Sequence, residues 1–267
     1  MAMTADKYDV FRALHRPGDP LRLANAWDVA SARVVEQAGA AAVATTSAGV
    51  AWSLGAKDGN VLDRDRAVDL VARVVAAVSV PVTADIEGGF ADDAAGVAET
   101  VRLVIAAGAA GINLEDSDRS GAAPQLTVVE AARRFAAARA AAGDGLFVNA
   151  RVDTFFHGGT VADALARARA YVDAGADGVF VPGTADPAVI TELVAAVGAP
   201  LNILVGPGSP TVAELAELGV ARVSLGSSVA EAAYAVVRRA AEELQAKGTY
   251  TAVEGGLAYG DVNALLP

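Results

Sequence analysis

The chain has 267 residues and a formal net charge of −11, and 54% of its residues are hydrophobic. This length is close to the roughly 250 residues of one (β/α)₈ barrel, so we expect a single domain over residues 1–267. The acidic balance argues against a nucleic-acid partner, because nucleic acids are bound through clustered Lys and Arg. Charges interrupt every apolar run before about 18 residues, so no membrane span is expected.

The sequence contains no Cys, which excludes disulfides, thiolate metal ligands and a cysteine nucleophile or acid. A chain without disulfides fits a reducing compartment. The polar N-terminal stretch, residues 1–19, lacks the apolar run of a signal peptide. We therefore expect a cytoplasmic protein.

Short apolar runs alternate with longer amphipathic runs along the chain. The short runs are uniformly apolar, which is typical of buried parallel strands rather than half-exposed antiparallel ones. We predict eight strands, at residues 21–27, 41–47, 81–87, 111–116, 147–153, 178–183, 201–206 and 221–227. Charges at helical spacing between them predict helices that include residues 62–78, 92–107, 127–142 and 160–174.

Turn and cap residues agree with this alternation. Gly follows predicted helices in the segments EQAGAAA, AAGAAGI and DAGADGV, where a left-handed residue ends a helix at little cost. Thr160, Asp186 and Thr211 stand at helix N-cap positions. Eight strand–helix units predict a closed α/β fold, the (β/α)₈ TIM barrel, with an open doubly wound sheet as the alternative. No GxGxxG follows the first predicted strand, which weakens a dinucleotide-binding fold.

In such a barrel, functional residues lie where the strands end. The third predicted strand ends in VTADIEGGF, and Asp85 and Glu87 are two residues apart, so both side chains would point the same way in a strand. Two carboxylates inside a barrel mouth are costly unless a cation is present. The alternative is that both are solvated loop carboxylates.

Two other units add carboxylates at the same rim. The fourth predicted strand ends in INLEDS, with Glu115 and Asp116, and the loop after the second carries Asp58 in LGAKDG. With no Cys and no pair of His, this oxygen-rich set suits Mg²⁺ or Mn²⁺ better than Zn²⁺. Mg²⁺ keeps several waters, so one direct ligand suffices, and we select Asp85.

The fifth predicted strand ends in VNARVDTF and carries Arg151, a permanent charge in an apolar run. Its planar fork suits a substrate carboxylate or phosphonate. The alternative is a structural ion pair with Glu115 or Asp153. No Lys ends a predicted strand, so a Schiff-base aldolase is not expected.

Weaker signals lie at other strand ends. Ser47 and Ala48 follow the second predicted strand and could donate hydrogen bonds to a carboxylate, although an ordinary turn explains them as well. The segments VGPGSPT and LGSS after the seventh and eighth strands could bind phosphate or form tight turns. We interpret His157 as an ordinary loop residue and His15 as a surface residue.

The segments NAWDVASARVVEQAG, LGAKDG, ADIEGG, INLEDS and NARVDTF, in this order and spacing, resemble the isocitrate lyase/phosphoenolpyruvate mutase superfamily. The resemblance runs from about residue 21 to the C-terminus. It implies that four carboxylates hold Mg²⁺, directly at Asp85 and through water at Asp58, Glu87 and Glu115. Arg151, Asp58 and Glu115 are the catalytic candidates that follow from it.

The same resemblance implies where a substrate binds. The substrate-binding candidates are Thr46, Ser47, Ala48, Asp85, Arg151 and, in the seventh predicted strand, Asn202. Superfamily members form tetramers in which a C-terminal helix packs on a neighbouring barrel. The segment Ser228–Lys247 would be that helix here, followed by a tail to residue 267, so we expect a homo-oligomer.

The implied chemistry is stabilisation of an enolate. A 2-oxo acid can chelate Mg²⁺, and the charge that develops as a neighbouring C–C or C–P bond breaks would be stabilised by the metal and Arg151. Two departures limit the assignment. The loop DSDRSGAAPQLTVVE lacks the Cys of the superfamily's C–C lyases, and Pro182 stands where its mutases and phosphonopyruvate hydrolases carry a His.

The function that we expect is therefore that of an Mg²⁺-dependent C–C lyase or decarboxylase acting on a small 2-oxo or 2-hydroxy acid. The enzymatic alternative is a phosphoenolpyruvate mutase or phosphonopyruvate hydrolase. A third reading is a 2-oxo acid-binding protein without turnover, which the missing loop acid favours.

Overall fold

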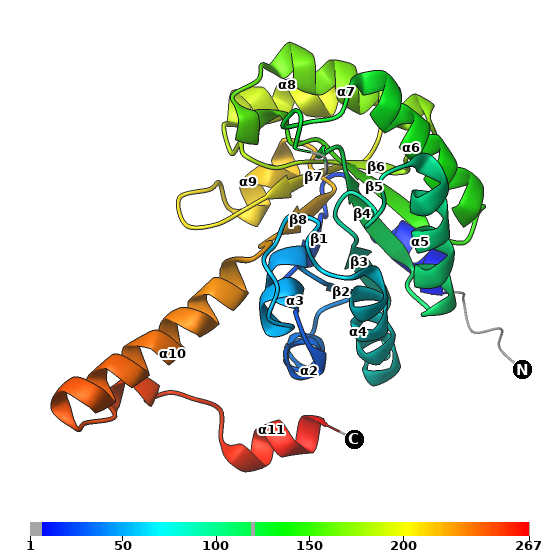
Figure 1. Cartoon of the computed structure of the whole chain (residues 1–267). Coiled ribbons are helices and arrows are strands. Elements are labelled where there is room, and N and C mark those ends of the chain that lie inside the picture. The colour runs from blue at the N-terminus through cyan, green and yellow to red at the C-terminus, as the bar shows by residue number, and fades with distance from the viewer. Residues whose placement is uncertain (1–6, 119–120, 267) are drawn as a thin grey trace, which may run out of the picture.

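The computed structural model describes residues 7–118 and 121–266. Eight parallel strands form one sheet in the spatial order β1-β8-β7-β6-β5-β4-β3-β2. Between β1 and β2, the Ala26 N–H donates to the carbonyl of Ala44 at the end of β2, and the Thr46 N–H donates to the Ala26 carbonyl. These two bonds bridge the remaining gap in the sheet and confirm the predicted (β/α)₈ barrel (Figure 1). The strands are β1 (Leu21–Leu23), β2 (Val43–Ala44), β3 (Val82–Asp85), β4 (Gly111–Glu115), β5 (Phe147–Arg151), β6 (Gly178–Val181), β7 (Leu201–Leu204) and β8 (Arg222–Ser224).

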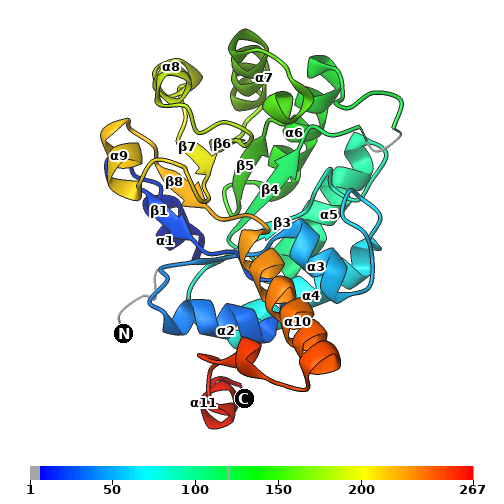
Figure 2. The ribbon, with the colours of Figure 1, turned by 90° about the vertical axis from the view of Figure 1, so that its left-hand side faces the viewer.

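Helices surround the barrel and connect successive strands (Figure 2). Thr160 and Thr211 form capping boxes with Asp163 and Glu214, and Asp186 accepts from the Ala188 N–H, so the three predicted N-caps are confirmed. The helices are α1 (Lys7–Ala13), α2 (Val29–Gln37), α3 (Ser47–Ser53), α4 (Arg64–Ala77), α5 (Ala94–Ala106), α6 (Val128–Ala142), α7 (Val161–Asp173), α8 (Pro187–Val197), α9 (Val212–Glu217), α10 (Ser228–Lys247) and α11 (Tyr259–Leu265), with 3₁₀ turns η1 (Thr154–His157) and η2 (Thr251–Val253).

The strands are shorter than predicted, mainly at their C-terminal ends. β3 ends at Asp85, and Glu87 has a φ of 50°, which is not an extended conformation. The expectation that Asp85 and Glu87 point the same way from one strand is therefore wrong. β2 ends at Ala44, and Ser47 begins helix α3 instead of closing a strand.

The N-terminal end of the barrel is closed by α1. Phe11 is fully buried, and the ring of His15 stacks on that of Phe147 with centroids 4.0 Å apart. His15 is only 8% exposed, and its Nδ1 lies 2.9 Å from the Phe11 carbonyl oxygen. The expectation that His15 is a surface residue is wrong, because the segment that follows α1 packs its ring against Phe147 of β5.

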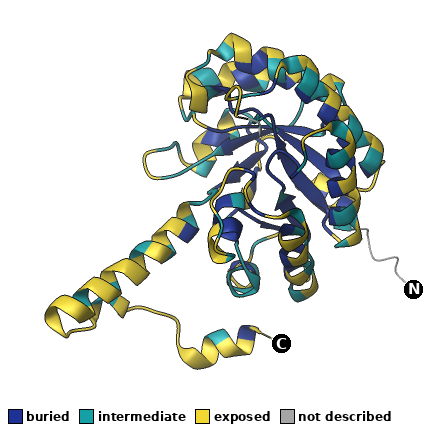
Figure 3. Ribbon diagram, in the orientation of Figure 1, coloured by how far each residue is buried: buried dark blue, intermediate teal, exposed yellow. Residues whose placement is uncertain are grey.

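Helix α10 extends away from the barrel, and Figure 3 shows it exposed along most of its length. Ala230, in its first turn, is its one buried residue. The chain then returns to the barrel at α11, where the Arg33 side chain of α2 donates to the Leu265 carbonyl at 2.6 Å. No helix within residues 7–118 and 121–266 is long and apolar enough to cross a membrane.

Candidate active site

A cavity of about 220 Å³ lies at the C-terminal ends of the strands. Six of the residues predicted from the sequence line it, namely Thr46, Ser47, Ala48, Asp58, Asp85 and Arg151. The lining residues that the sequence analysis did not select are Asn25, Asn113, Phe156, Phe180, Pro182, Leu204, Ser224, Gly226 and Ser227. His157 is exposed and does not line this cavity.

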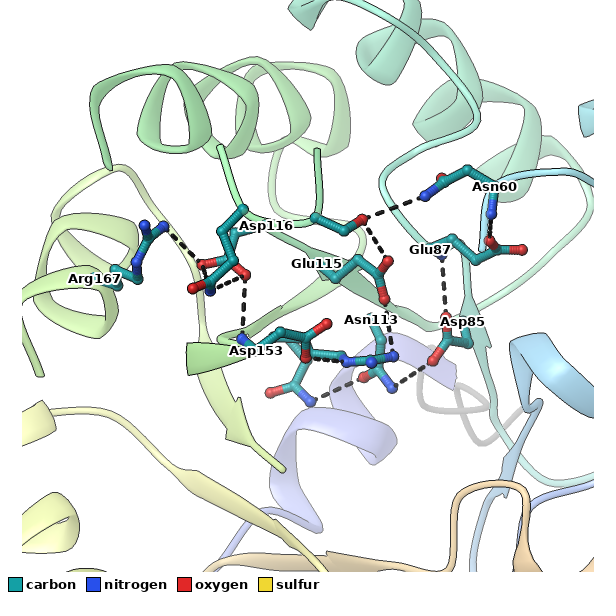
Figure 4. Close-up of polar contacts among 12 residues, drawn as sticks. Asn60, Asp85, Glu87, Asn113, Glu115, Asp116, Asp153 and Arg167 are labelled. Atoms are coloured by element: carbon teal, nitrogen blue, oxygen red, sulfur yellow. Dashed lines mark hydrogen bonds and ion pairs between the residues drawn. The ribbon is translucent and has the colours of Figure 1, made fainter. Parts of the chain in front are cut away.

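Asp85 is the last residue of β3, and its backbone and carboxylate make three hydrogen bonds. Its backbone N–H donates to Thr45 Oγ1 at 2.9 Å, its Oδ1 accepts from the Glu87 N–H at 3.1 Å, and its Oδ2 faces Asn113 Nδ2 at 3.4 Å (Figure 4). Burial raises the pKa of Asp85 to about 6, with the Arg151 charge opposing the rise and Glu115 and Asp58 adding to it. A cation beside this carboxylate would offset that cost.

Glu87 lies next to Asp85 but is tied to the loop between α3 and α4. Its Oε2 accepts from the Asn60 N–H, and the Asn60 side chain in turn accepts from the Gly88 N–H at 3.0 Å. Burial and, to a smaller extent, the charges of Asp58, Asp85 and Glu115 raise the pKa of Glu87 to about 8, against the opposing effect of the Asn60 hydrogen bond. These contacts fasten the loop that carries Asp58 to the end of β3.

Arg151 ends β5 and holds two carboxylates. Its Nη1 lies 2.8 Å from Glu115 Oε2, and its Nε lies 2.6 Å from Asp153 Oδ1. Burial alone would lower the pKa of Arg151, but these carboxylates hold it above its ordinary value. One ion pair uses Nη1 and the other uses Nε, and within residues 7–118 and 121–266 neither involves Nη2, which can therefore donate to a ligand. The structural ion pairs that the sequence left as an alternative are present, and the residue also lines the cavity.

Glu115 and Asp116 are adjacent in the sequence but lie on opposite sides of the strand. Glu115 faces Arg151 and accepts from the Ser117 hydroxyl at 2.5 Å. Asp116 is fully buried and accepts from Tyr171 Oη at 2.7 Å and Arg167 Nη1 at 3.1 Å. Asp116 therefore holds α7 against the barrel and does not face the cavity.

A layer of amide side chains lies beneath the cavity. Asn149 Nδ2 donates to Asn113 Oδ1 at 2.9 Å and lies 3.4 Å from Asn202 Oδ1. Asn202 donates to Ser224 Oγ at 3.2 Å, and Ser224 lines the cavity whereas Asn202 does not. Arg222 Nη2 also donates to Asn113 Oδ1, at 3.1 Å. The oxygen of Asn113 thus accepts two bonds, which turns its Nδ2 towards Asp85.

The donor set fits a hard divalent cation that keeps most of its waters. Within the described ranges, no three His, Asp or Glu side chains converge as a complete ligand set. The charges of Glu115 and Asp58 nevertheless contribute to the raised pKa of both Asp85 and Glu87. Mg²⁺ needs one or two carboxylates and is otherwise satisfied by water and substrate oxygens.

The comparisons with known proteins agree with one another. The model of the family described as phosphoenolpyruvate phosphomutase matches residues 11–245. An uncharacterized protein of Mycobacterium tuberculosis (strain H37Rv) is 42% identical over 220 residues, 81% of this chain and 81% of its own length. The 2-methylisocitrate lyase of Salmonella typhimurium (strain LT2) is 36% identical over 191 residues, 68% of this chain but 62% of that enzyme.

A solved structure also matches nearly the whole chain. The phosphonopyruvate hydrolase crystallised with oxalate and Mg²⁺ is 27% identical, with a TM-score of 0.85 over 97% of this chain and 94% of its own. The relatives therefore include both a 2-methylisocitrate lyase and a phosphonopyruvate hydrolase.

Proposed function

The chain belongs to the phosphoenolpyruvate phosphomutase family, within the isocitrate lyase/phosphoenolpyruvate mutase superfamily, and from that premise we propose that it is an Mg²⁺-dependent lyase or decarboxylase of a small 2-oxo or 2-hydroxy acid. One observation carries this proposal: Asp85 and Arg151 line one cavity at the barrel mouth. A buried carboxylate for a cation and a guanidinium for an anion are the two groups that a chelating 2-oxo acid requires.

The proposed ligand positions follow from this arrangement. Asp85 would contact Mg²⁺ directly, with Asp58, Glu87 and Glu115 acting through water, and Mn²⁺ could replace it. Ser47 and Ala48 begin α3, where their backbone N–H groups can donate to the carboxylate of the ligand. The Thr46 N–H already donates to the Ala26 carbonyl at 3.0 Å, so Thr46 would contribute its hydroxyl. Asn202 would act from beneath, through Asn149, by keeping the amide layer in place.

The reaction needs a place for the electron pair of the broken bond. In the decarboxylation of oxaloacetate the C3–C4 bond breaks, C4 leaves as CO₂, the electron pair moves to C3 and onto the 2-oxo oxygen, and C3 then takes up a proton. In the cleavage of a 2-methylmalate-type acid the C2–C3 bond breaks, the 2-hydroxyl loses its proton to form the 2-oxo product, and the electron pair moves to C3 and its carboxylate before C3 is protonated. Mg²⁺, when bound, supplies Lewis-acid stabilisation of the oxygen on C2. Arg151 keeps its charge fixed beside the cavity through Glu115 and Asp153, so it stabilises the developing anion without moving.

Calorimetry of oxalate binding with and without Mg²⁺ tests the metal site. Asp85→Asn should abolish the Mg²⁺-dependent part of oxalate binding, because the direct ligand loses its charge. Asp144→Asn, at an exposed position in the loop before β5, is the matched control and should bind as the wild type does. Mg²⁺-dependent oxalate binding that survives in Asp85→Asn would show that another carboxylate is the ligand.

A substrate panel with Mg²⁺ separates the reaction types. Pyruvate formed from oxaloacetate, or C–C cleavage of 2-methylmalate-type acids, supports the proposal. Release of phosphate from phosphonopyruvate, or its conversion to phosphoenolpyruvate, would support the C–P reading, although Pro182 lines the cavity at β6 and offers no proton donor there. Binding without turnover of any member of the panel would support a binding protein.

We also propose that the chain self-associates through α10. This helix exposes Tyr234, Val236, Val237 and Leu244. Next to its first turns a hollow of about 520 Å³ is lined by Trp52, Tyr234 and Arg238. Light scattering should therefore give the mass of an oligomer, and Val237→Glu should lower it. A wild-type mass equal to one chain would contradict this proposal.

A further inference from the structure

Asn113 lines the cavity, and its side chain is held by two residues beneath it. It lies on β4, beside Asp85 of β3 and Asn149 of β5 in the strand register, and it is 5% exposed. Asn149 and Arg222 both donate to its Oδ1, and neither of them lines the cavity. The amide oxygen of Asn113 is therefore turned away from the cavity, and its amide nitrogen is turned towards it.

Arg222 decides which end of the Asn113 amide faces the cavity. A guanidinium has N–H donors and no acceptor, so the atom 3.1 Å from Arg222 Nη2 has to be the oxygen of Asn113. The reversed amide would place two donors against each other at a fully buried position, which is costly. Amides that contact only other amides can all be reversed together. Arg222 removes that freedom from Asn113.

The amide nitrogen of Asn113 carries two hydrogens but has one acceptor. Asp85 Oδ2 lies 3.4 Å from it (Figure 4), and no other acceptor of this nitrogen lies within residues 7–118 and 121–266. An Asn side chain can donate two hydrogen bonds through Nδ2. Because Asn113 is buried and lines the cavity, its second N–H is available to a ligand oxygen there.

Asp85, Asn113 and Arg151 come from three successive strands and all line the cavity. The register pairs Glu115 with Arg151, so Arg151 lies two residues nearer the barrel mouth than the row that contains Asp85 and Asn113. Residues two apart in a strand face the same side. A ligand oxygen that shares a cation with Asp85 would therefore have Asn113 beneath it and Arg151 on its outer side.

We propose that Asn113 is a catalytic residue that donates its second N–H to the oxygen on C2 of the ligand. This inference rests on the proposed function, because that oxygen is the one that would share the cation with Asp85. The oxygen on C2 gains negative charge in both proposed reactions, as an enolate when oxaloacetate loses CO₂ and as an alkoxide when a 2-methylmalate-type acid is cleaved. A donor that is already oriented stabilises this charge without reorganisation and transfers no proton.

Oxalate and pyruvate test the donation because they differ in charge at this oxygen. Oxalate presents a carboxylate oxygen there, as an enolate would, whereas pyruvate presents a neutral carbonyl. Asn113→Leu removes the donor and leaves the charge of the site unchanged. In calorimetry with Mg²⁺, oxalate affinity should fall by about ten- to a hundredfold and pyruvate affinity by only about two- to tenfold. A purely structural role for Asn113 would weaken both ligands alike, so an equal loss would overturn the inference.

Thr83→Val is the matched control. Thr83 lies on β3 two residues before Asp85 and is 1% exposed, and its hydroxyl has no hydrogen-bond partner among the described residues. It does not line the cavity. The variant removes a buried polar group from the same barrel interior, so both affinities should stay at their wild-type values. Asn113→Ala is the second test variant, because it leaves space for a water beside Arg222 if Asn113→Leu does not fold.

A measurement on the wild-type chain keeps the test available if neither variant folds. The two side-chain amide protons of Asn113 give separate NMR signals. Adding oxalate to the protein with Mg²⁺ should move one of these signals downfield, because a proton donated to an anionic oxygen is deshielded. Signals that keep their positions at saturating oxalate would contradict the donation.

Oxalate binding by the wild type separates this inference from the proposed function. If oxalate fails to bind with Mg²⁺, the proposed function is wrong and the inference falls with it. If oxalate binds and the loss of the Asn113 donor weakens oxalate and pyruvate equally, the inference alone is wrong.

Discussion

Arg222 is a buried cation whose replacement should stabilise the protein. It is fully buried, donates one hydrogen bond to Asn113, and has no partner for Nε and Nη1 among the described residues. Burial lowers its pKa from 12.5 to about 9, against the attraction of Asp85. At about 1.4 kcal/mol for each pKa unit, holding this charge costs on the order of 5 kcal/mol. The cost is fully present below pH 9, where folded Arg222 keeps its proton, and it fades as the pH rises towards 12.5.

We expect Arg222→Met to raise the free energy of unfolding by roughly 1–4 kcal/mol at pH 7, the range found when buried charges are replaced by apolar residues of similar size. Urea unfolding measures it as a higher midpoint at an unchanged m-value. Asp85 would lose the attraction of the Arg222 charge, so more of this carboxylate would be protonated near neutral pH and Mg²⁺-dependent oxalate binding should weaken in the same variant. Such an exchange of stability for function is common at active sites.

Arg134 provides the matched control. It is equally buried, at 6% exposed, but its guanidinium reaches the carbonyls of Ala91 and Asp92 at 3.3 and 2.7 Å and the carboxylate of Glu130 at 3.4 Å. Arg134→Met leaves these acceptors without their donor and should destabilise the fold by roughly 1–3 kcal/mol. If Arg222→Met loses stability as Arg134→Met does, its N–H groups are satisfied in solution and the reasoning is refuted.

Three further changes have defined outcomes. Burial and the nearby Arg222 lower the pKa of His15 from 6.5 to about 3, so the unfolded state binds the proton first and stability falls as the pH drops below 6.5. The variant His15→Phe should therefore lose about 2 kcal/mol less unfolding free energy than the wild type between pH 7 and pH 5. An equal loss in both proteins would contradict this prediction. A Cβ at Gly111 would lie 2.6 Å from Phe11 Cε1, so Gly111→Ala should lower the unfolding free energy by roughly 1–3 kcal/mol, whereas Gly206→Ala, with nothing within 4 Å, should not. Arg151→Lys keeps the positive charge but loses the planar guanidinium. Its affinity for oxalate in the presence of Mg²⁺ should therefore fall by about ten- to a hundredfold while the melting temperature is retained. A lower melting temperature with unchanged oxalate affinity would mean that Arg151 has a purely structural role.

The barrel fold and the cavity residues at the strand ends could be predicted from the sequence. Alternating apolar runs and helix caps such as Thr160 depend on local chemistry, which the sequence displays directly. Asp85 and Arg151 could be selected because any polar residue that closes a buried parallel strand must stand at the barrel mouth. Both do line the cavity.

Side-chain positions that depend on backbone bends or on residues distant in the sequence could not be predicted from the sequence. Glu87 lies beyond the end of β3 and itself has a left-handed backbone conformation. The direction of its side chain therefore could not be predicted from its two-residue spacing to Asp85. His15 is buried by Phe147, which is more than a hundred residues away in the sequence. Phe180 and Pro182, which are two residues apart at the end of β6 and line the cavity, could have been predicted in the same way as Asp85 and Arg151.

Because β1 pairs with β8, the barrel can close only after β8 has been synthesised. β1 pairs along its length only with β8, and the Gly226 N–H reaches back to Asn25 Oδ1 at 2.9 Å across 201 residues. Chains emerge from the ribosome N-terminal end first, at about 5–20 residues per second. For roughly ten seconds or more, β1 therefore has no ladder partner while β2 to β7 can already pair. The nascent chain carries open strand edges for that time, when chaperones would have the most to protect.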